Sequence, residues 1–176
     1  MDVETAAKNG GDEDKRAAKN GGDIDTKKMT TMENLMLFLM QTIANGLELP
    51  NLVIDEDCGQ LDAIAQGLDQ YPVTFPCVLI GDSEVVFRDV KEPAQRGTLT
   101  MTVRLAFDVY DDTRLGSGQE QSIADRMAAN TQLTEILADL CLPNSRDRLH
   151  RTVFRSYSLP HGVKVYETVY QANVTM

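Results

Sequence analysis

Residues 98–112, TLTMTVRLAFDVYDD, alternate between apolar and polar side chains over an unusual length. Strict alternation predicts a β-strand that buries one face and turns the other toward solvent. About 13 residues at the usual rise span roughly 40 Å, more than twice the length of an ordinary strand. A chain with such a strand must fold around a sheet. The side chains predicted to be buried are Leu99, Met101, Val103, Leu105, Phe107 and Val109.

Two long helices are predicted on either side of this strand in the sequence. The first begins with a capping box of Thr30 and Glu33 and ends at Asn45-Gly46. Its apolar side chains cover most of its circumference, so we expect it to be buried on more than one side. The longest helix lies within residues 117–143, with a bend or a break near residues 129–133. Its predicted inner side carries Ile123, Met127, Ile136, Leu137 and Leu140.

A short helix is predicted within residues 57–70, opened by Asp57 and Gln60. The acidic cluster Asp55–Asp57 precedes it. Paired carboxylates can act as acid and base or hold a metal, but here we expect them to complement the helix dipole. The apolar face of this helix is predicted to consist of Leu61, Ile64, Ala65 and Leu68.

The remaining strands are predicted as two pairs. Residues 75–82 and 84–90 are close enough to form a hairpin, and residues 150–159 and 162–176 form a closing antiparallel pair. The apolar residues of the last strand change phase, which predicts a β-bulge. The order of elements indicates an α+β fold, with a single mostly antiparallel or mixed sheet and helices packed on one face.

The chain is predicted to divide near residue 29. Residues 6–16 and 17–27 repeat one pattern, and the first 28 residues hold only two large apolar side chains beyond the initiator. Such a segment buries too little surface to offset its ordering entropy, so residues 1–28 are expected to form a disordered acidic tail. Residues 29–176 are expected to form one α+β domain.

Composition excludes several function classes. A net charge of −10 argues against a surface that grips nucleic acid or an anionic membrane. The two histidines have no ligand partners at metal-binding spacing, and no phosphate-binding or nucleophile motif occurs. We therefore expect no catalytic residue, no metal and no cofactor. The three cysteines, Cys58, Cys77 and Cys141, are expected to be buried thiols.

From about Met32 to Val174, the chain resembles the tail terminator or tail completion proteins of long-tailed bacteriophages. The resemblance is carried by the leading helix, by FPCVLIG, by GTLTMTVRLAFDVYDD, by QSIADRMAANTQLTEILADL and by the closing FRSYSL…VYETVYQANV. Proteins of this family form rings, commonly hexamers, at the head-proximal end of the tail tube. They stop the growth of the tube and present a surface to the head connector.

The resemblance implies a non-enzymatic structural protein of a phage or prophage, made in the bacterial cytoplasm and built into the virion tail. Its implied partners are further copies of itself, the tail tube protein and the head connector, while DNA only passes through the channel. An acidic channel repels phosphate and lets DNA slide. A closed ring needs a contact between two different patches of neighbouring copies. The candidate interface residues, taken from two charged loops, are Glu92, Arg96, Asp111, Asp112 and Arg114.

Two other classes of function stay open from the sequence. One is a bacterial interaction module that uses the open face of the sheet. The other is a small-molecule-binding or hydrolytic domain, which would use the carboxylates within residues 55–62 or 108–112. The state of association separates the ring from both alternatives.

Overall fold

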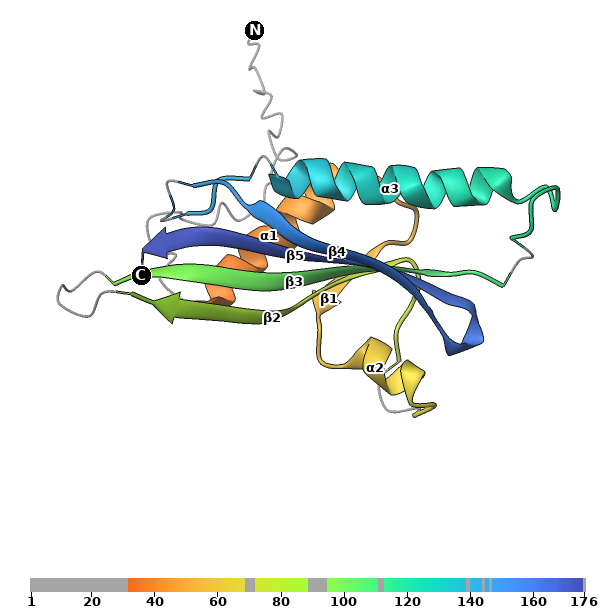
Figure 1. Cartoon of the computed structure of the whole chain (residues 1–176), viewed down its shortest axis with the longest axis horizontal. Helices are drawn as coiled ribbons and strands as arrows, with labels where there is room; N and C mark the ends of the chain where they lie inside the picture. The colour runs from red at the N-terminus through yellow and green to blue at the C-terminus, as the bar shows by residue number, and fades with distance from the viewer. Residues whose placement is uncertain are drawn as a thin grey trace, which may run out of the picture.

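The computed structural model describes residues 32–68, 72–88, 95–110, 113–138, 140–143, 145 and 147–175. Its strands form a five-stranded sheet in the order β1-β2-β3-β5-β4 (Figure 1). The strands β1 and β2 are parallel, and every other neighbouring pair is antiparallel. The fold is therefore α+β with a mixed sheet, as predicted. The strands are β1 (Val53–Glu56), β2 (Cys77–Phe87), β3 (Arg96–Asp108), β4 (His150–Leu159) and β5 (Val163–Thr175).

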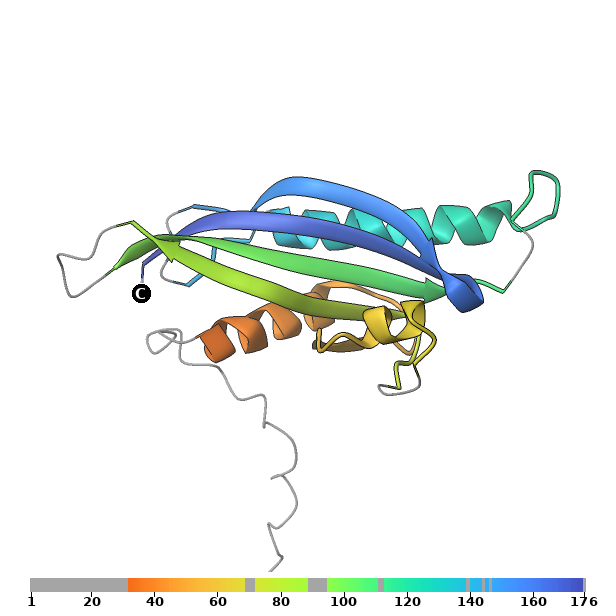
Figure 2. The same ribbon diagram turned by 60° about the horizontal axis from the view of Figure 1, so that its bottom comes forward.

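The long alternating strand is confirmed as β3, which has 13 residues. It pairs with the equally long β5 in an unbroken register from Arg96–Thr175 to Asp108–Val163. Four of the six side chains predicted to be buried are fully enclosed, while Phe107 is half-buried and Val109 is half-buried beyond the end of the strand. The β3–β5 pair thus forms the long central part of the sheet (Figure 2).

Two helices cover one face of the sheet, which we call the helical face. They are α1 (Met32–Gly46) and α3 (Glu120–Ala138). Leu39, Ile43 and Leu137 are almost fully enclosed against the odd-numbered side chains of β3. Tyr166 and Tyr170 of β5 belong to the same core. This layer supplies most of the buried apolar surface and therefore most of the hydrophobic stabilisation.

The opposite face, which we call the second face, is covered at one end only. There the short helix α2 (Gln60–Ala65) packs Leu61 against a small core. In both views α2 lies at the end of the sheet that carries the turn at Pro160–Gly162 (Figures 1 and 2). The prediction that the helices pack on one face is therefore correct for α1 and α3 and wrong for α2, whose Leu61 fills the small core on the second face. The small core consists of Leu61, Cys77, Leu79, Ala106, Val163 and Val165.

Two strand predictions are wrong. Residues 75–82 and 84–90 do not form a hairpin: Cys77–Phe87 is one strand, and the Gly-Asp at 81–82 passes through a shift of register against β3. The bulge predicted in the last strand does not occur. Its phase change arises because Val163 and Val165 are buried on the second face while Tyr166 and Tyr170 are buried on the helical face. The register shift lies instead in β4, between Arg151 and Val153.

The helix predictions are partly confirmed. The first helix ends at Gly46, but Leu37 is half-exposed, so burial is concentrated on one side. The longest helix is a single element whose buried line is Ala129, Leu133 and Leu137, and Met127 is exposed. The short helix covers only Gln60–Ala65 of the predicted 57–70; Ala65 and Leu68, which lies beyond its end, are exposed. The predicted tail of residues 1–28 and the capping residue Thr30 lie outside the described residues.

Candidate functional site

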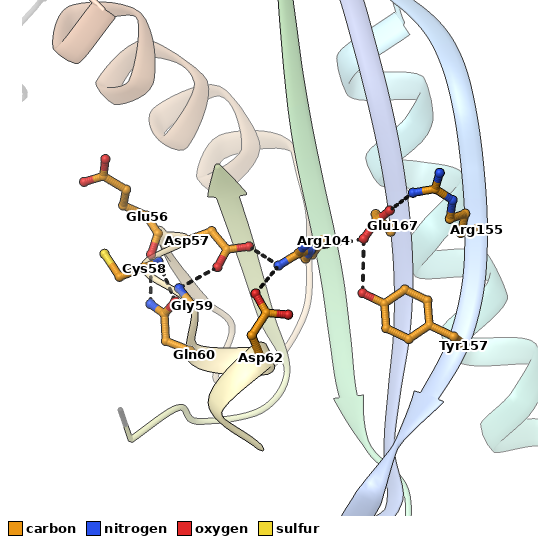
Figure 3. A network of polar contacts seen from close by, with 10 residues as sticks. All are labelled: Glu56, Asp57, Cys58, Gly59, Gln60, Asp62, Arg104, Arg155, Tyr157 and Glu167. Atoms are coloured by element: carbon orange, nitrogen blue, oxygen red, sulfur yellow. Dashed lines mark hydrogen bonds and ion pairs between the residues drawn. The ribbon is translucent and has the colours of Figure 1, made fainter. Parts of the chain in front are cut away.

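The most concentrated polar chemistry in the described residues lies on the second face, around Arg104 of β3 (Figure 3). Its guanidinium bonds a carboxylate on either side. Nη1 donates to Asp57 Oδ2 at 2.8 Å, and Nε donates to Glu167 Oε2 at 3.1 Å. Asp62 of α2 is a third partner, with its Oδ2 3.6 Å from Nη1. Arg104 therefore ties the loop before α2 to the centre of the sheet. We call Arg104, Asp57, Asp62, Glu167, Arg155 and Tyr157 the Arg104 cluster.

Glu167 of β5 is the second centre of the cluster. Its side chain is only 8% exposed, yet it accepts hydrogen bonds from Arg155 Nη1 at 2.8 Å and from Tyr157 Oη at 3.1 Å. Burial acts to raise the pKa of Glu167, but the hydrogen bonds from Arg155, Tyr157 and Arg104 outweigh it and lower that pKa. Glu167 is therefore ionised at neutral pH.

The loop that carries Asp57 is fixed by its own side chains. Asp57 Oδ1 accepts from the Gly59 N–H, and Gln60 bonds the Cys58 N–H and the Glu56 carbonyl. A β-carbon at Gly81 would lie 2.5 Å from Cβ of Asp57, so only glycine lets this aspartate lie flat on β2. The sequence suggested that Asp57 complements a helix dipole, but its charge is instead paired with Arg104.

Three members of the cluster, Glu167, Arg104 and Tyr157, have pKa values shifted away from neutrality. Burial lowers the pKa of Arg104, but the nearby charges, that of Asp57 above all, outweigh this effect and raise it. Burial, together with the charge of Glu167, raises the pKa of Tyr157 to about 12. A general acid or base works best with a pKa near the operating pH. The pKa values of Arg104, Tyr157 and Glu167 thus do not suit acid–base catalysis near neutral pH, whereas their ion pairs and hydrogen bonds suit fixing α2 on the sheet.

Beyond the Arg104 cluster, β3 and β5 carry an uncharged polar stripe on the second face, and the exposed Glu84 and Val86 of β2 lie beside it. Gln171 donates to Thr100 across the two strands at 3.2 Å, and Thr98 contacts Asn173 at 3.5 Å. These four side chains are half-buried or exposed, unlike the enclosed residues that lie opposite them on the helical face. The name polar stripe is used below for Thr98, Thr100, Gln171 and Asn173.

Two of the predicted interface residues, Arg96 and Arg114, are among the described residues. Arg96 is the exposed first residue of β3, and Arg114 is exposed in the connection between β3 and α3. Arg96 begins β3, whereas Arg114 follows the other end of this strand, which spans about 40 Å at the usual rise per residue. Glu92, Asp111 and Asp112 lie outside the described residues.

The predictions about the cysteines and histidines can also be compared with the structure. Cys77 is buried, and burial followed by the charge of Asp57 raises its pKa to about 12, whereas Cys58 and Cys141 are exposed thiols. The expectation of three buried cysteines is therefore wrong. His150 and His161 are both exposed. Within the described residues, no His, Cys, Asp or Glu side chains form a group of three that is fit to hold a metal ion, and no helix is long and apolar enough to span a membrane.

The Arg104 cluster was not predicted as a site. The sequence shows Arg104 as the one charged residue among the polar positions between Thr98 and Ala106, which is the only local signal. Its partners Asp57 and Glu167 are 47 and 63 residues away in the chain. Only the pairing of β3 with β5 and the return of the loop before α2 bring them together.

No protein-family model matches the chain, and no curated protein matches it. Among solved structures, it is similar to a chain from the virion of a native gene transfer agent particle. That similarity has a TM-score of 0.47 at 14% identity and covers 78% of this chain and 84% of the other. At this TM-score the likeness adds nothing to what the chain's own residues indicate about function.

Proposed function

We propose that this protein is a structural, non-enzymatic component of a phage or prophage tail that forms a ring at the head-proximal end of the tail tube. The ring ends tube growth and joins the tail to the head connector, and DNA passes through its channel. The proposal continues the resemblance of residues 32–174 to tail terminator proteins. The leading helix, the long alternating strand, the long helix and the closing antiparallel pair that carried this resemblance occur in that order as α1, β3, α3 and β4–β5, whereas the predicted hairpin is the single strand β2.

The observation that carries the proposal is the asymmetry of the long β3–β5 pair. Its helical face is closed by α1 and α3, whereas the polar stripe on its second face has no helix over it among the described elements. In a ring of copies standing side by side, the second faces line the channel, α1 and α3 lie outside, and α2 lies on the channel side at one end of the sheet. A lining of hydroxyls and amides lacks the clustered Lys and Arg that hold phosphate, so DNA slides along it.

The ring is proposed to be a hexamer. Since the two charged loops lie at opposite ends of the strands, each is proposed to contact the neighbouring copy at its own rim of the ring. Glu92 and Arg96 serve one rim, and Asp111, Asp112 and Arg114 serve the other. Exposed ion pairs are individually weak, so assembly should depend on concentration and salt.

Sedimentation velocity over a range of concentrations, followed by electron microscopy of the protein mixed with tail tubes, tests this function. We expect a closed oligomer that binds tube ends, and Arg96→Glu or Arg114→Glu should weaken it while the circular dichroism spectrum stays unchanged. The control is Glu135→Arg, a charge reversal at an exposed position near the C-terminal end of α3. A protein that stays monomeric and ignores tube ends refutes the ring and leaves the interaction module or a small-molecule-binding domain.

A further inference from the structure

The two outer strands of the sheet carry opposite charge. The edge strand β4, HRTVFRSYSL, contains His150, Arg151 and Arg155 and no acidic residue. All of its residues except Tyr157 and Leu159 are exposed. A strand of this kind pairs on one side only and offers backbone N–H and C=O groups on the other. In a chain with a net charge of −10, this strand is a basic edge.

The other outer strand, β1, has the sequence VIDE and contains no basic residue. Asp55 and Glu56 are exposed, and so is Glu84 on the part of β2 that extends past β1. The β1 edge is therefore acidic. Natural edge strands often carry charges that discourage pairing, but a basic edge and an acidic edge on one molecule favour head-to-tail pairing between copies.

The backbone hydrogen bonds show which N–H and C=O groups of β1 point away from β2. The N–H groups of Val53 and Asp57 donate inward to the carbonyls of Pro76 and Ile80 of the β2 segment. Since backbone groups alternate in direction along a strand, those of Ile54 point outward. The outward groups of Glu56 are already engaged, because Asp55 accepts from its N–H and Gln60 donates to its carbonyl.

The same alternation turns the backbone groups of Phe154 outward from β4. Val109 N–H donates to the Gly162 carbonyl at 2.7 Å, so odd-numbered residues of β3 bond toward β5. Odd-numbered residues of β5 then bond toward β4, and their partners there include Arg155 opposite Glu167. The backbone N–H and C=O groups of Phe154, the neighbour of Arg155, therefore point away from β5. Its side chain is 46% exposed although it stacks on Tyr166.

We propose that a second copy of this chain docks its β4 edge against the β1 edge, so that the sheet continues from one subunit to the next. The inference rests on the proposed ring and names its lateral contact. In the sheet, β4 and β1 run in opposite directions. The copies in a ring are related by rotation about the ring axis. Where that axis runs along the strands, rotation leaves the strand directions unchanged, so β4 of one copy meets β1 of the next as an antiparallel pair.

One register satisfies the backbone, the side chains and the charges together. Ile54 lies opposite Phe154 of the next copy, since both have outward backbone groups and both side chains lie on the helical face. The shift of register in β4 then brings Arg151, also on the helical face, beside Glu56. On the second face, Asp55 lies diagonal to Arg155, within the reach of a long side chain. The contact is short, so we expect weak association that strengthens when a ring closes.

Disulfide trapping tests the register directly. In a Cys58→Ser, Cys141→Ser background, Ile54→Cys and Phe154→Cys are placed in one chain and oxidised. A hydrogen-bonded antiparallel pair has Cα atoms about 5.5 Å apart, which suits a disulfide. We expect a ladder of covalent oligomers ending at one closed species. The control chain, which pairs Ile54→Cys with Met127→Cys on α3, should give no ladder.

Reversing the charges of a proposed ion pair is an independent test that changes no cysteine. Arg151→Glu and Glu56→Arg should each weaken association by about tenfold or more, because like charges then face each other. The double variant should recover association, since the pair is restored with its signs reversed. Glu135→Arg, on the exposed side of α3, should leave association unchanged.

The outcomes separate this inference from the proposed function. A chain that caps tail tubes but gives no ladder, and whose association ignores both charge reversals, overturns the edge contact and leaves the terminator function standing. A ladder and a rescued double variant without any binding to tubes support the edge contact and remove the terminator function. A chain that stays monomeric, gives no ladder and binds no tube overturns both.

Discussion

Arg104→Met removes the cation that lies between two enclosed carboxylates. The side chains of Asp57 and Glu167 are each 8% exposed, and that of Arg104 is 14% exposed, so solvent compensates little for the loss. Breaking a buried pair by removing one partner typically costs 3–5 kcal/mol, because the remaining charge stays buried. Arg155 and Tyr157 still hold Glu167, whereas Asp57 keeps only the N–H of Gly59. We therefore expect a loss of about 3 kcal/mol, at the lower end of that range.

Urea unfolding followed by far-ultraviolet circular dichroism measures this loss as a change in the free energy of unfolding. The matched control is Arg96→Met on the same strand, which removes an exposed guanidinium and should change stability by less than about 0.5 kcal/mol. Adding Asp57→Asn to Arg104→Met should recover part of the loss, because the unpaired charge is removed. Equal effects of Arg104→Met and Arg96→Met would show that the cluster is not enclosed and would refute this reasoning.

The cluster also makes a prediction about pH. The pKa of Glu167 is lower in the folded protein than its ordinary value, so its stabilising contribution is complete above the unfolded pKa of about 4.3. That contribution is lost as the pH falls through the lower pKa of the folded state. The difference in unfolding free energy between the wild type and Glu167→Gln should therefore be constant above about pH 5 and shrink in more acidic solution. A difference that grows toward low pH contradicts the assignment.

Three further predictions concern the sheet and its cysteines. Met101→Ala should lower the free energy of unfolding in urea by about 2–5 kcal/mol, because this side chain is fully enclosed. Thr100→Ala, on the opposite face, should lower it by less than about 1 kcal/mol. Equal losses would mean that both faces of β3 are enclosed. Gly81→Ala should destabilise the fold by about 1–3 kcal/mol in the same assay, since the new methyl group displaces the aspartate above it. A thiol reagent at pH 8 should modify Cys58 rapidly and Cys77 only after unfolding, which mass spectrometry reads directly.

The alternation of β3 identified Leu99, Met101, Val103 and Leu105 as buried, because one face of this strand is enclosed along most of its length. The closing strand at residues 150–159 also has the predicted limits, although almost all of its side chains are exposed. β5 is enclosed on both faces at one end, so its pattern imitates a bulge. β2 contains a Gly-Asp dipeptide, which is a common turn signal, and here tertiary pairing with β3 carries the strand through it.

The candidate site was harder to predict than the fold, because its partners come from distant segments. β1 has four residues, two of them acidic, and its local sequence resembles a loop more than a strand. Without β1 in the sheet, nothing in the sequence shows that Asp55 and Glu56 lie on an outer edge. The charged segments around Arg96 and Arg114 were recognisable, but only the length of β3 shows that these two residues are separated by a whole strand.

The Arg104 cluster and the polar stripe on the second face differ in exposed charge from the outer strand β4. The charge of Arg104 is neutralised within the chain, and the polar stripe carries amides and hydroxyls, so the proposed channel wall presents little positive charge. The largest group of exposed cations on the described strands is on β4. Charges are screened beyond about 8 Å at physiological ionic strength, so this edge attracts the acidic edge of another copy only at close approach. Charge therefore favours the right pair of edges, while the outward backbone groups of Ile54 and Phe154 set the register.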